Sequence, residues 1–327
     1  MKKLHVPYNG HSSCLNMYAN WAEYIQDIYF APSHNVFSSA RATETNGDEN
    51  IIIEWAHAHS IRAALLLNGI ADKKSNLFLE HLKQYLTPIV EHGLDIIVVS
   101  DPFLILWISN HFPKLKIRSS ILSHNTSIPS ILMSKKLGKC EEVCLPLEFN
   151  RNFDELKKLK LACPDIKFSL LVTSTCRLNC PLFYWHQFSH NYPEYWQDYE
   201  YSNWCNNLYL AINSLPKAPL QNGFILPSEL KEYDEYIDGY KIEGRDFSTG
   251  MLESIVRLYC LRTDPIYLNE LLNSPCNNFP TDFKLNQLPE EWVKYRKNCK
   301  THCTENCPYF QLCFNGQLMQ KQIDESL

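Results

Sequence analysis

Short apolar segments, many of them rich in β-branched residues, recur along the chain, and longer segments with apolar residues at helical spacing separate them. We predict strands at DIYFAP (27–32), IRAALLL (61–67), DIIVVS (95–100), KLKIRSS (114–120), EEVCLPL (141–147), KFSLLVT (167–173), GFILP (223–227) and DGYKIEG (238–244). Alternating strands and helices build a parallel sheet, and eight such repeats favour closure into a barrel. The predicted fold class is α/β, a (β/α)8 TIM-barrel-like domain; a doubly wound open sheet is the alternative.

One connection is too long for a simple strand-to-helix loop. It separates KFSLLVT from GFILP, and its stretch 181–220 is dense in Tyr, Trp, Asn and Pro. We predict a long aromatic insert after strand 6, on the barrel face where active sites form. The barrel is expected to span 1–274, and 275–327 to form a Cys-rich C-terminal appendage with too few apolar residues for its own core.

Charge and hydropathy narrow the classes of partner. The 327 residues carry 31 Lys and Arg against 36 Asp and Glu, a net charge of -5, so nucleic acid is not the default partner, although RNA stays open. The N-terminus has no apolar signal-peptide core, and no segment is apolar and long enough to span a bilayer. We predict a cytoplasmic protein with no membrane partner.

The sequence contains 13 cysteines, which a reducing cytosol would not pair as structural disulfides. Six occur singly or in apolar surroundings and are expected to be ordinary core or surface residues: Cys14, Cys140, Cys144, Cys163, Cys260 and Cys276. Four form a Cx3Cx3Cx5C pattern in the tail: Cys299, Cys303, Cys307 and Cys313. Thiolates this close suit an iron-sulfur cluster or zinc, with a tail of free thiols as the alternative.

A second group of cysteines follows a predicted strand. Cys176 and Cys180 come directly after KFSLLVT, which would place them at the carboxyl-terminal mouth of the barrel. Cys205, in the insert, could converge on them, and Cys14 or a tail cysteine could complete a set of four. The alternative is a pair of half-buried thiols in a loop.

Two histidines in the insert are candidates for proton transfer. His186 and His190 are four residues apart and would share a face if PLFYWHQFSH is helical. They could face a substrate or a metal. A hydrogen-bonded pair packed among aromatic side chains is an equal alternative.

Charged residues mark the end of the last predicted strand. Lys241 and Glu243 lie on one strand face, Arg245 follows, and Gly244 permits positive φ between them. A charge that points into a barrel mouth is costly unless it is paired or used. A structural Arg-Glu bridge is the alternative. A second list of expected mouth residues contains Asn68, Asp101 and Arg151.

Taken together, these segments resemble the peptidase U32 family. The similar segments are LEFNRNFDELKKL (147–159), TCRLNCPLFYWHQFSH (175–190), ILPSELKEYDEYIDGYKIEGRD (225–246) and the Cys-rich C-terminus. The third is the most specific, because a Lys-Ile-Glu-Gly-Arg strand and then a Val-Arg-x-Tyr helix, here with Tyr259, are typical of the family. The likeness runs from the first strand to Cys313.

The resemblance implies a TIM-barrel-like domain and, in several members, a 4Fe-4S cluster held by cysteines. It also implies oxygen-independent hydroxylation of ubiquinone precursors or ribosomal RNA, with prephenate as an oxygen source, whereas other members are called collagenase-like proteases. Some relatives act as heterodimers. The cysteine spacing departs from that of the hydroxylation relatives, because Cys176 and Cys180 form the close pair first.

The leading hypothesis is a U32-type iron-sulfur enzyme that modifies a small molecule, peptide or RNA base by oxygen-independent hydroxylation or related redox chemistry. In it Glu243 and Arg245 orient an anionic co-substrate, and His186 or His190 moves protons. The alternatives are a peptidase or other hydrolase, although no HExxH or GxSxG motif is present, and a non-catalytic, cluster-bearing subunit of a heterodimer.

Overall fold

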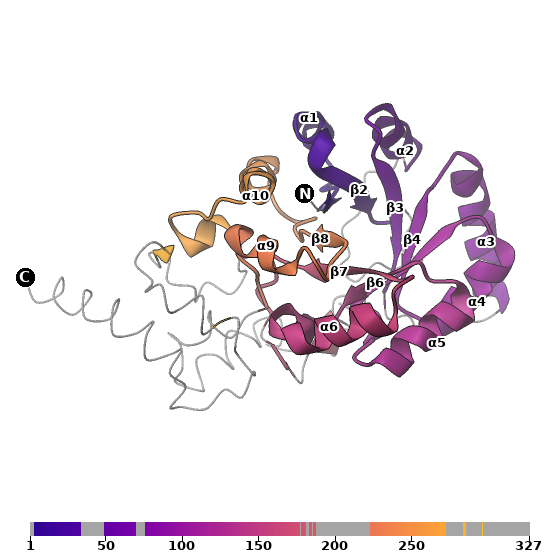
Figure 1. Cartoon of the computed structure of the whole chain (residues 1–327). Helices are drawn as coiled ribbons and strands as arrows, with labels where there is room; N and C mark the ends of the chain where they lie inside the picture. The colour runs from indigo at the N-terminus through magenta and orange to yellow at the C-terminus, as the bar shows by residue number, and fades with distance from the viewer. Residues whose placement is uncertain are drawn as a thin grey trace, which may run out of the picture.

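Eight parallel strands close into a barrel. The structure, a computed structural model, describes residues 3–33, 49–69, 76–176, 178–180, 183–184, 186–187, 223–272, 284–285 and 296. The strands are β1 (Lys3–Pro7), β2 (Ile25–Phe30), β3 (Arg62–Leu67), β4 (Ile96–Val99), β5 (Lys116–Ser119), β6 (Glu142–Leu145), β7 (Lys167–Leu171) and β8 (Gly239–Lys241). Each strand pairs with the next, and β8 pairs with β1, so the predicted (β/α)8 barrel is confirmed (Figure 1).

Helices surround the strands on the outside of the barrel (Figure 1). They are α1 (Ser12–Ala19), α2 (Glu49–Ala58), α3 (Asn76–Glu91), α4 (Pro102–His111), α5 (Ile128–Gly138), α6 (Phe153–Ala162), α9 (Leu230–Tyr233) and α10 (Thr249–Leu261). The 3-10 turns are η1 (Ala22–Tyr24), η2 (Ile121–Ser123), η3 (Leu147–Arg151), η7 (Pro227–Glu229) and η8 (Leu268–Glu270). Side-chain caps begin several helices; the Asp101 carboxylate, for example, accepts a hydrogen bond from Phe103 N at 2.8 Å.

Seven of the eight predicted strands are present, but the prediction of a strand at 223–227 is wrong. The apolar residues of GFILP are buried, but 223–226 form neither helix nor strand. The barrel is instead completed by β1, in the segment KLHVP, which we had not predicted to be a strand. Because β7 pairs directly with β8, no sheet edge remains for 223–226. The insert 181–220 therefore follows β7 and not a sixth strand.

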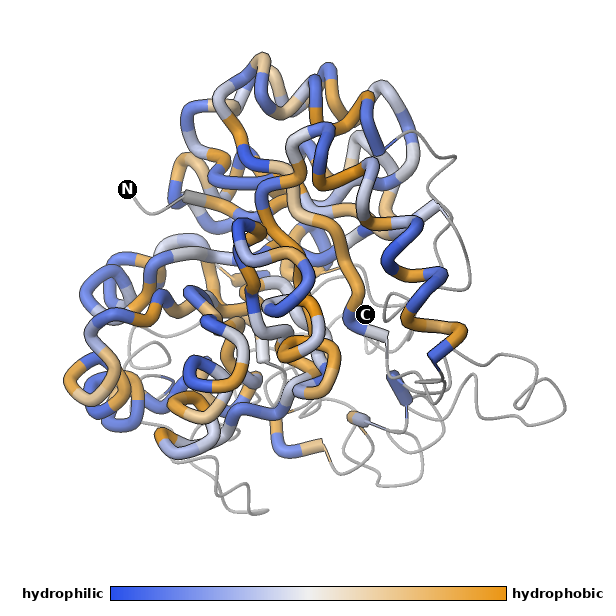
Figure 2. The backbone as a smooth tube through the Cα atoms, turned by 90° about the vertical axis from the view of Figure 1, so that its right-hand side faces the viewer, coloured by the Kyte–Doolittle hydropathy of each residue, from blue (hydrophilic) through white to orange (hydrophobic). Residues whose placement is uncertain are grey.

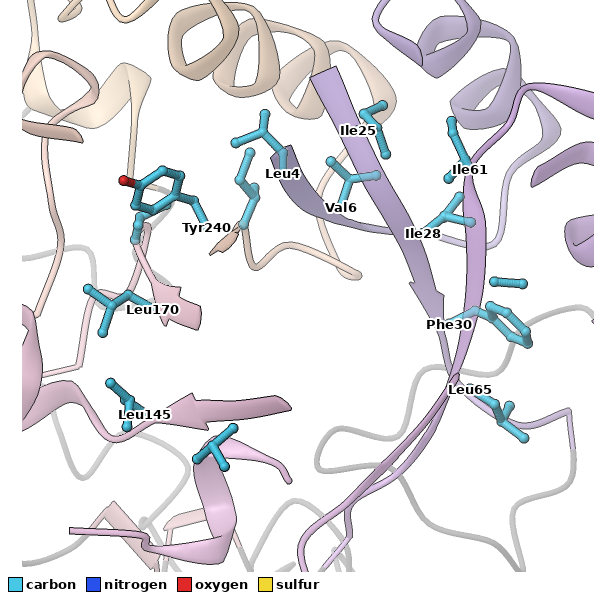
Figure 3. Close-up of a cluster of buried hydrophobic side chains, with 14 of the residues drawn as sticks. Leu4, Val6, Ile25, Ile28, Phe30, Ile61, Leu65, Leu145, Leu170 and Tyr240 are labelled. Carbon is cyan, nitrogen blue, oxygen red and sulfur yellow. The ribbon is translucent and has the colours of Figure 1, made fainter. Parts of the chain in front are cut away.

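The hydrophobic core lies mainly between the barrel wall and the helices. Leu4, Val6, Ile28 and Phe30 project from their strands toward this layer and are fully buried (Figure 3). Along the helices hydrophobic and hydrophilic residues alternate, whereas the strands are more uniformly hydrophobic (Figure 2). This distribution is the one expected for amphipathic helices packed on a buried parallel sheet.

The lower barrel interior contains charged side chains in place of apolar ones. Asp27 on β2 accepts two hydrogen bonds from the Arg118 guanidinium on β5, at 2.6 and 3.0 Å. His5 Nδ1 lies 2.8 Å from Asp27 Oδ2, and His5 Nε2 lies 3.2 Å from Glu142 Oε1 on β6. Arg118 Nε also reaches Glu142, at 2.9 Å. We call these four buried residues the barrel network.

The barrel network is stabilised by attraction between its charges and needs the space that Gly239 leaves for His5. Burial alone would raise the pKa of Asp27, but Arg118 and His5 outweigh burial and hold it well below its usual range. A Cβ added to Gly239 on β8 would lie 2.0 Å from His5 Nε2, so only glycine leaves room for the imidazole to reach Glu142. The network therefore depends on a small residue on the strand next to β1.

We predict that Asp27→Asn lowers the free energy of unfolding by about 3–5 kcal/mol, because it leaves the Arg118 guanidinium buried without its main counter-charge. The matched control is Asp165→Asn, since Asp165 forms an exposed pair with Lys135 at 3.4 Å. That change should cost at most about 1 kcal/mol. Chemical unfolding curves give both values, and equal losses in the two variants would contradict a stabilising role of the network.

We also predict that stability falls in acid. The same balance lowers the pKa of Glu142 from 4.5 to about 2: burial alone would raise it, but Arg118 and His5 outweigh burial. The folded protein therefore binds fewer protons than the unfolded chain, so this stabilisation is present above pH 4.5 and is lost as the pH falls toward 2. The raised pKa of His5 acts oppositely and contributes below 6.5. Thermal midpoints that stay constant down to about pH 3 would contradict this prediction.

Candidate functional site

A cavity opens at the carboxyl ends of the barrel strands. Its lining residues are Tyr29, Leu66, Asn68, Ile121, Leu122, Leu171, Ser174, Cys176, Phe183, Gln187, Lys241, Glu243, Gly244 and Arg245. They come from the ends of β2, β3, β7 and β8 and from the segments that follow the strands. We call this hollow the mouth cavity; it lies on the face where barrel enzymes carry their active sites.

The end of β8 contributes the charges of the mouth cavity. Lys241, Glu243 and Arg245 all line it, as the alternation of strand faces predicts for the first two. Gly244 has φ +129°, and a Cβ there would approach the Phe247 ring to 2.4 Å, so the backbone turn between Glu243 and Arg245 requires glycine. The Glu243 backbone N–H donates to Thr173 Oγ1 at 2.9 Å, which fixes the strand end.

Lys241 is the one of these three charges that lies within β8 itself, and its side chain is half-buried. Its Nζ lies 4.5 Å from the centre of the Tyr29 ring, and the Tyr29 hydroxyl donates to Ile242 O at 2.6 Å. Among the described residues, no carboxylate forms an ion pair with Lys241. Burial lowers the pKa of Lys241, and the positive charges of Arg245 and Arg118 lower it further.

Cys176 and Cys180 lie beyond β7 at the mouth, as predicted, and both are half-buried. Cys176 lines the mouth cavity; its backbone N–H donates to Ser174 Oγ at 3.2 Å. Cys180 lines a neighbouring hollow, and Phe183 and Ile121 contribute to both spaces. The two thiols therefore stand in adjoining spaces at one end of the barrel.

The other described cysteines do not join this pair. Each is a buried free cysteine, as expected for ordinary core residues: Cys14, Cys140, Cys144, Cys163 and Cys260. Burial raises the pKa of Cys14 to about 11 and those of Cys140 and Cys260 to about 12. The described residues contain no group of three metal-ligating side chains. The remaining predicted ligands lie outside the described residues, as does Cys276: Cys205, Cys299, Cys303, Cys307 and Cys313.

Only some of the other residues predicted at the mouth line the mouth cavity. His186 is helical, but its neighbour Gln187 lines the mouth cavity, and His190 lies outside the described residues. Asn68 lines the cavity, where its Nδ2 donates to Ser120 Oγ at 3.0 Å. Asp101 caps α4, and Arg151 is buried at the end of η3.

The segment 223–226, which was predicted to be a strand, is bonded to the end of β7. Gly223 N donates to Cys176 O at 2.9 Å, and Asn150 Nδ2 donates to Leu171 O at 2.7 Å and also bonds Gly223 O. Tyr259 Oη lies 2.6 Å from Ile225 O. Asn150 and Tyr259 thus clamp the segment 223–226 against the end of β7, next to Cys176.

One residue of the C-terminal region also reaches this clamp. Arg296 is fully buried: its Nε lies 3.0 Å from Glu229 Oε1, and its Nη2 donates to Phe224 O. The guanidinium also stacks on the Phe224 ring, with 4.1 Å between its carbon and the ring centre. Arg296 is therefore held against the segment that supports Cys176.

The sequence match shows the family. The model of peptidase family U32 matches residues 13–176, half of the 327-residue chain, and the chain belongs to this family. The uncharacterized protease MJ1657 of Methanocaldococcus jannaschii is 24% identical over 264 residues, covering 77% of this chain and 76% of that protein. The tRNA hydroxylation protein P of Escherichia coli K12 is 25% identical over 152 residues, 46% of this chain and 32% of that relative.

The fold comparison agrees with the family. The solved structure of the U32 peptidase Mk0906 aligns with a TM-score of 0.55 at 12% identity, over 74% of this chain and 92% of that one. At this identity the likeness concerns the fold alone. No helix among the described residues has the length and apolar character needed to cross a membrane.

We predict that iodoacetamide alkylates Cys176 and Cys180 well before the five buried cysteines, in protein from which metal has been removed. Half-exposed thiols are accessible, whereas burial both shields Cys14 and keeps its thiol protonated, with a pKa of about 11. Timed labelling and peptide mass mapping measure the order. Labelling of Cys14 or Cys140 at the rate of Cys176 would contradict the placement of these thiols.

Proposed function

We propose that this protein is a U32-type iron-sulfur enzyme, which carries out oxygen-independent hydroxylation or a related redox modification at the mouth cavity. The observation that carries the proposal is the pair of accessible thiols, Cys176 and Cys180, beside a cavity with charged walls. Similarity to a tRNA hydroxylation protein supports the reaction class. The substrate class is a small molecule, a peptide or an RNA base.

The donor chemistry at the mouth fits a cluster. Soft thiolates are the usual ligands of iron-sulfur clusters, and Cys176 and Cys180 supply two from one short segment. Cys205 and the tail cysteines Cys299, Cys303 and Cys307 are candidates for the others, together with Cys313. A bound 4Fe-4S cluster would supply one-electron redox chemistry; zinc in the tail is the alternative metal.

The anchoring of Arg296 supports a contribution from the tail. Arg296 bonds Phe224 O, and the adjacent Gly223 bonds Cys176 O. Cys299 follows Arg296 by three residues, so the chain length between them allows at most about 11 Å of separation. A tail cysteine is thus within reach of the region that holds Cys176.

The charged residues have proposed roles in binding and proton transfer. Arg245 would grip the carboxylate of an anionic co-substrate, since a guanidinium binds carboxylates in a bidentate manner. Glu243 would orient that molecule and exchange protons with it. His186, or His190 in the insert, would move protons between the cavity and solvent.

Two other functions are the alternatives. The similarity to an uncharacterized protease favours peptide hydrolysis as the second candidate. A hydrolase would need an activated nucleophile or a metal-bound water at the same mouth. A cluster-bearing subunit that needs a heterodimer partner is the third; dependence of soluble expression on a co-expressed partner would favour it.

We predict that anaerobically purified protein contains iron and acid-labile sulfide, and that the Cys176→Ala, Cys180→Ala double variant loses most of both, because two thiolate ligands are gone. Cys163→Ala is the matched control, since Cys163 is buried at the end of α6, away from the mouth. Iron, zinc and sulfide analysis with an absorption spectrum measures the outcome, and circular dichroism checks the fold.

The possible results separate the candidates. Unchanged iron in the double variant would contradict cluster binding by the mouth thiols. Zinc without sulfide, together with peptide hydrolysis that chelators inhibit, would favour the hydrolase. Retention of metal by the Cys163→Ala control is required for the comparison to hold.

A further inference from the structure

Lys241 carries an amine that the proposed function leaves without a role, and its side chain is half-buried. It stands on β8 between the barrel network below and the mouth cavity above, and it lines that cavity. Its Nζ lies 4.5 Å from the centre of the Tyr29 ring, over the ring face. An ammonium is expensive to bury without a carboxylate partner, and none pairs with it among the described residues. A neutral amine faces no such cost.

We propose that Lys241 is a carbonyl-reactive amine, which forms an imine with an oxo acid bound in the mouth cavity. The co-substrate class is thus a small aldehyde or ketone that also carries a carboxylate. Lys241 would take the carbonyl, and Arg245, which lines the same cavity, would bind the carboxylate. The inference rests on the proposed function for the position of the co-substrate in the mouth cavity. It does not require an iron-sulfur cluster.

The reaction balances without an oxidant or a reductant. The neutral amine attacks the carbonyl carbon, a C–N bond forms, and the carbonyl oxygen takes up a proton to give a carbinolamine. Loss of that oxygen as water leaves a protonated imine. Glu243, which lines the cavity beside Lys241, can supply and accept these protons. The attachment is reversible and makes the bound carbon skeleton more reactive.

The surroundings of Lys241 favour the neutral amine. Burial lowers the pKa of Lys241, and Arg245 above and Arg118 below lower it further, whereas Cys144 on β6 and Glu243 act in the opposite direction. Tyr29, from β2, presents its ring face to Nζ, and this contact acts in the opposite direction, because a ring face attracts a cation. His5, which pairs with Lys241 across the β1–β8 ladder, belongs to the barrel network. Desolvation beside other cations is a known way to activate a lysine nucleophile.

The test uses the full chain as purified, with glyoxylate or pyruvate as the probe and sodium borohydride to reduce any imine to a stable amine. We expect peptide mapping to find Lys241 labelled several-fold above exposed Lys116, because a lowered pKa raises the fraction of the amine that is neutral and nucleophilic. Lys116, with a side chain 49% exposed, is the internal reference in the same digest.

Two comparisons sharpen the result. Acetaldehyde has the carbonyl but no carboxylate, and Arg245→Gln should reduce the preference for glyoxylate over acetaldehyde by about tenfold, the usual size of a lost charged hydrogen bond. Lys241→Arg keeps a cation but should abolish the mouth adduct. If that variant does not fold, the peptide map of the unaltered protein still tests the imine, because the comparison of Lys241 with Lys116 requires no substitution.

Each outcome bears on the inference. Labelling of Lys116 with Lys241 unmodified would overturn it, as would an adduct that forms without borohydride. If glyoxylate binds in the mouth cavity but borohydride traps no covalent adduct, the cavity binds the anion only, and this result would also overturn the inference. Iron analysis of the same sample keeps the two proposals apart: iron with an unlabelled Lys241 refutes the imine alone, and a labelled Lys241 without iron refutes the cluster alone.

Discussion

The ion pair between Asp27 and Arg118 is the interaction on which the barrel interior depends. It joins β2 to β5 across the barrel, and His5 and Glu142 extend it to β1 and β6. A buried charge that loses its partner is costly, so these strands are held in the one register that brings all four side chains together. Most barrels fill this space with branched apolar residues. Here polar complementarity, with Gly239 leaving the necessary room, specifies how the sheet closes.

The barrel network also influences the site above it. Arg118 lies beneath Lys241, and its positive charge contributes to the lowered pKa of that amine. The interior thus changes along its axis from a paired charged layer, through Lys241 against the Tyr29 ring, to the mouth cavity with Glu243 and Arg245. Structural and candidate functional residues therefore share the strands but occupy successive levels.

Sequence reasoning was most reliable where a strand is purely apolar. Seven strands were predicted from short segments with an apolar, often β-branched, centre, whereas β1 was missed because Lys3 and His5 interrupt its apolar residues. The charge of His5 is explained only by Asp27 and Glu142, which lie on other strands. The opposite error occurred at 223–226, where apolar residues are buried by packing and clamping and not by strand pairing. In the site, the spacing of Lys241 and Glu243 correctly indicated a common face. Nothing local indicated Tyr29 or Gln187, which reach the cavity from distant segments.

The sequence by itself determined the α/β alternation, the barrel, the family, and the position of Cys176 and Cys180 at the end of a strand. Those properties depend on local periodicity and on motifs that are contiguous along the chain. Only the tertiary structure decided which charges meet inside the barrel, that Asn150 and Tyr259 clamp the segment after the insert, and that Lys241 stands without a carboxylate partner among the described residues. The physical reason is that pairing, burial and pKa depend on neighbours distant in sequence, which barrel closure alone brings together.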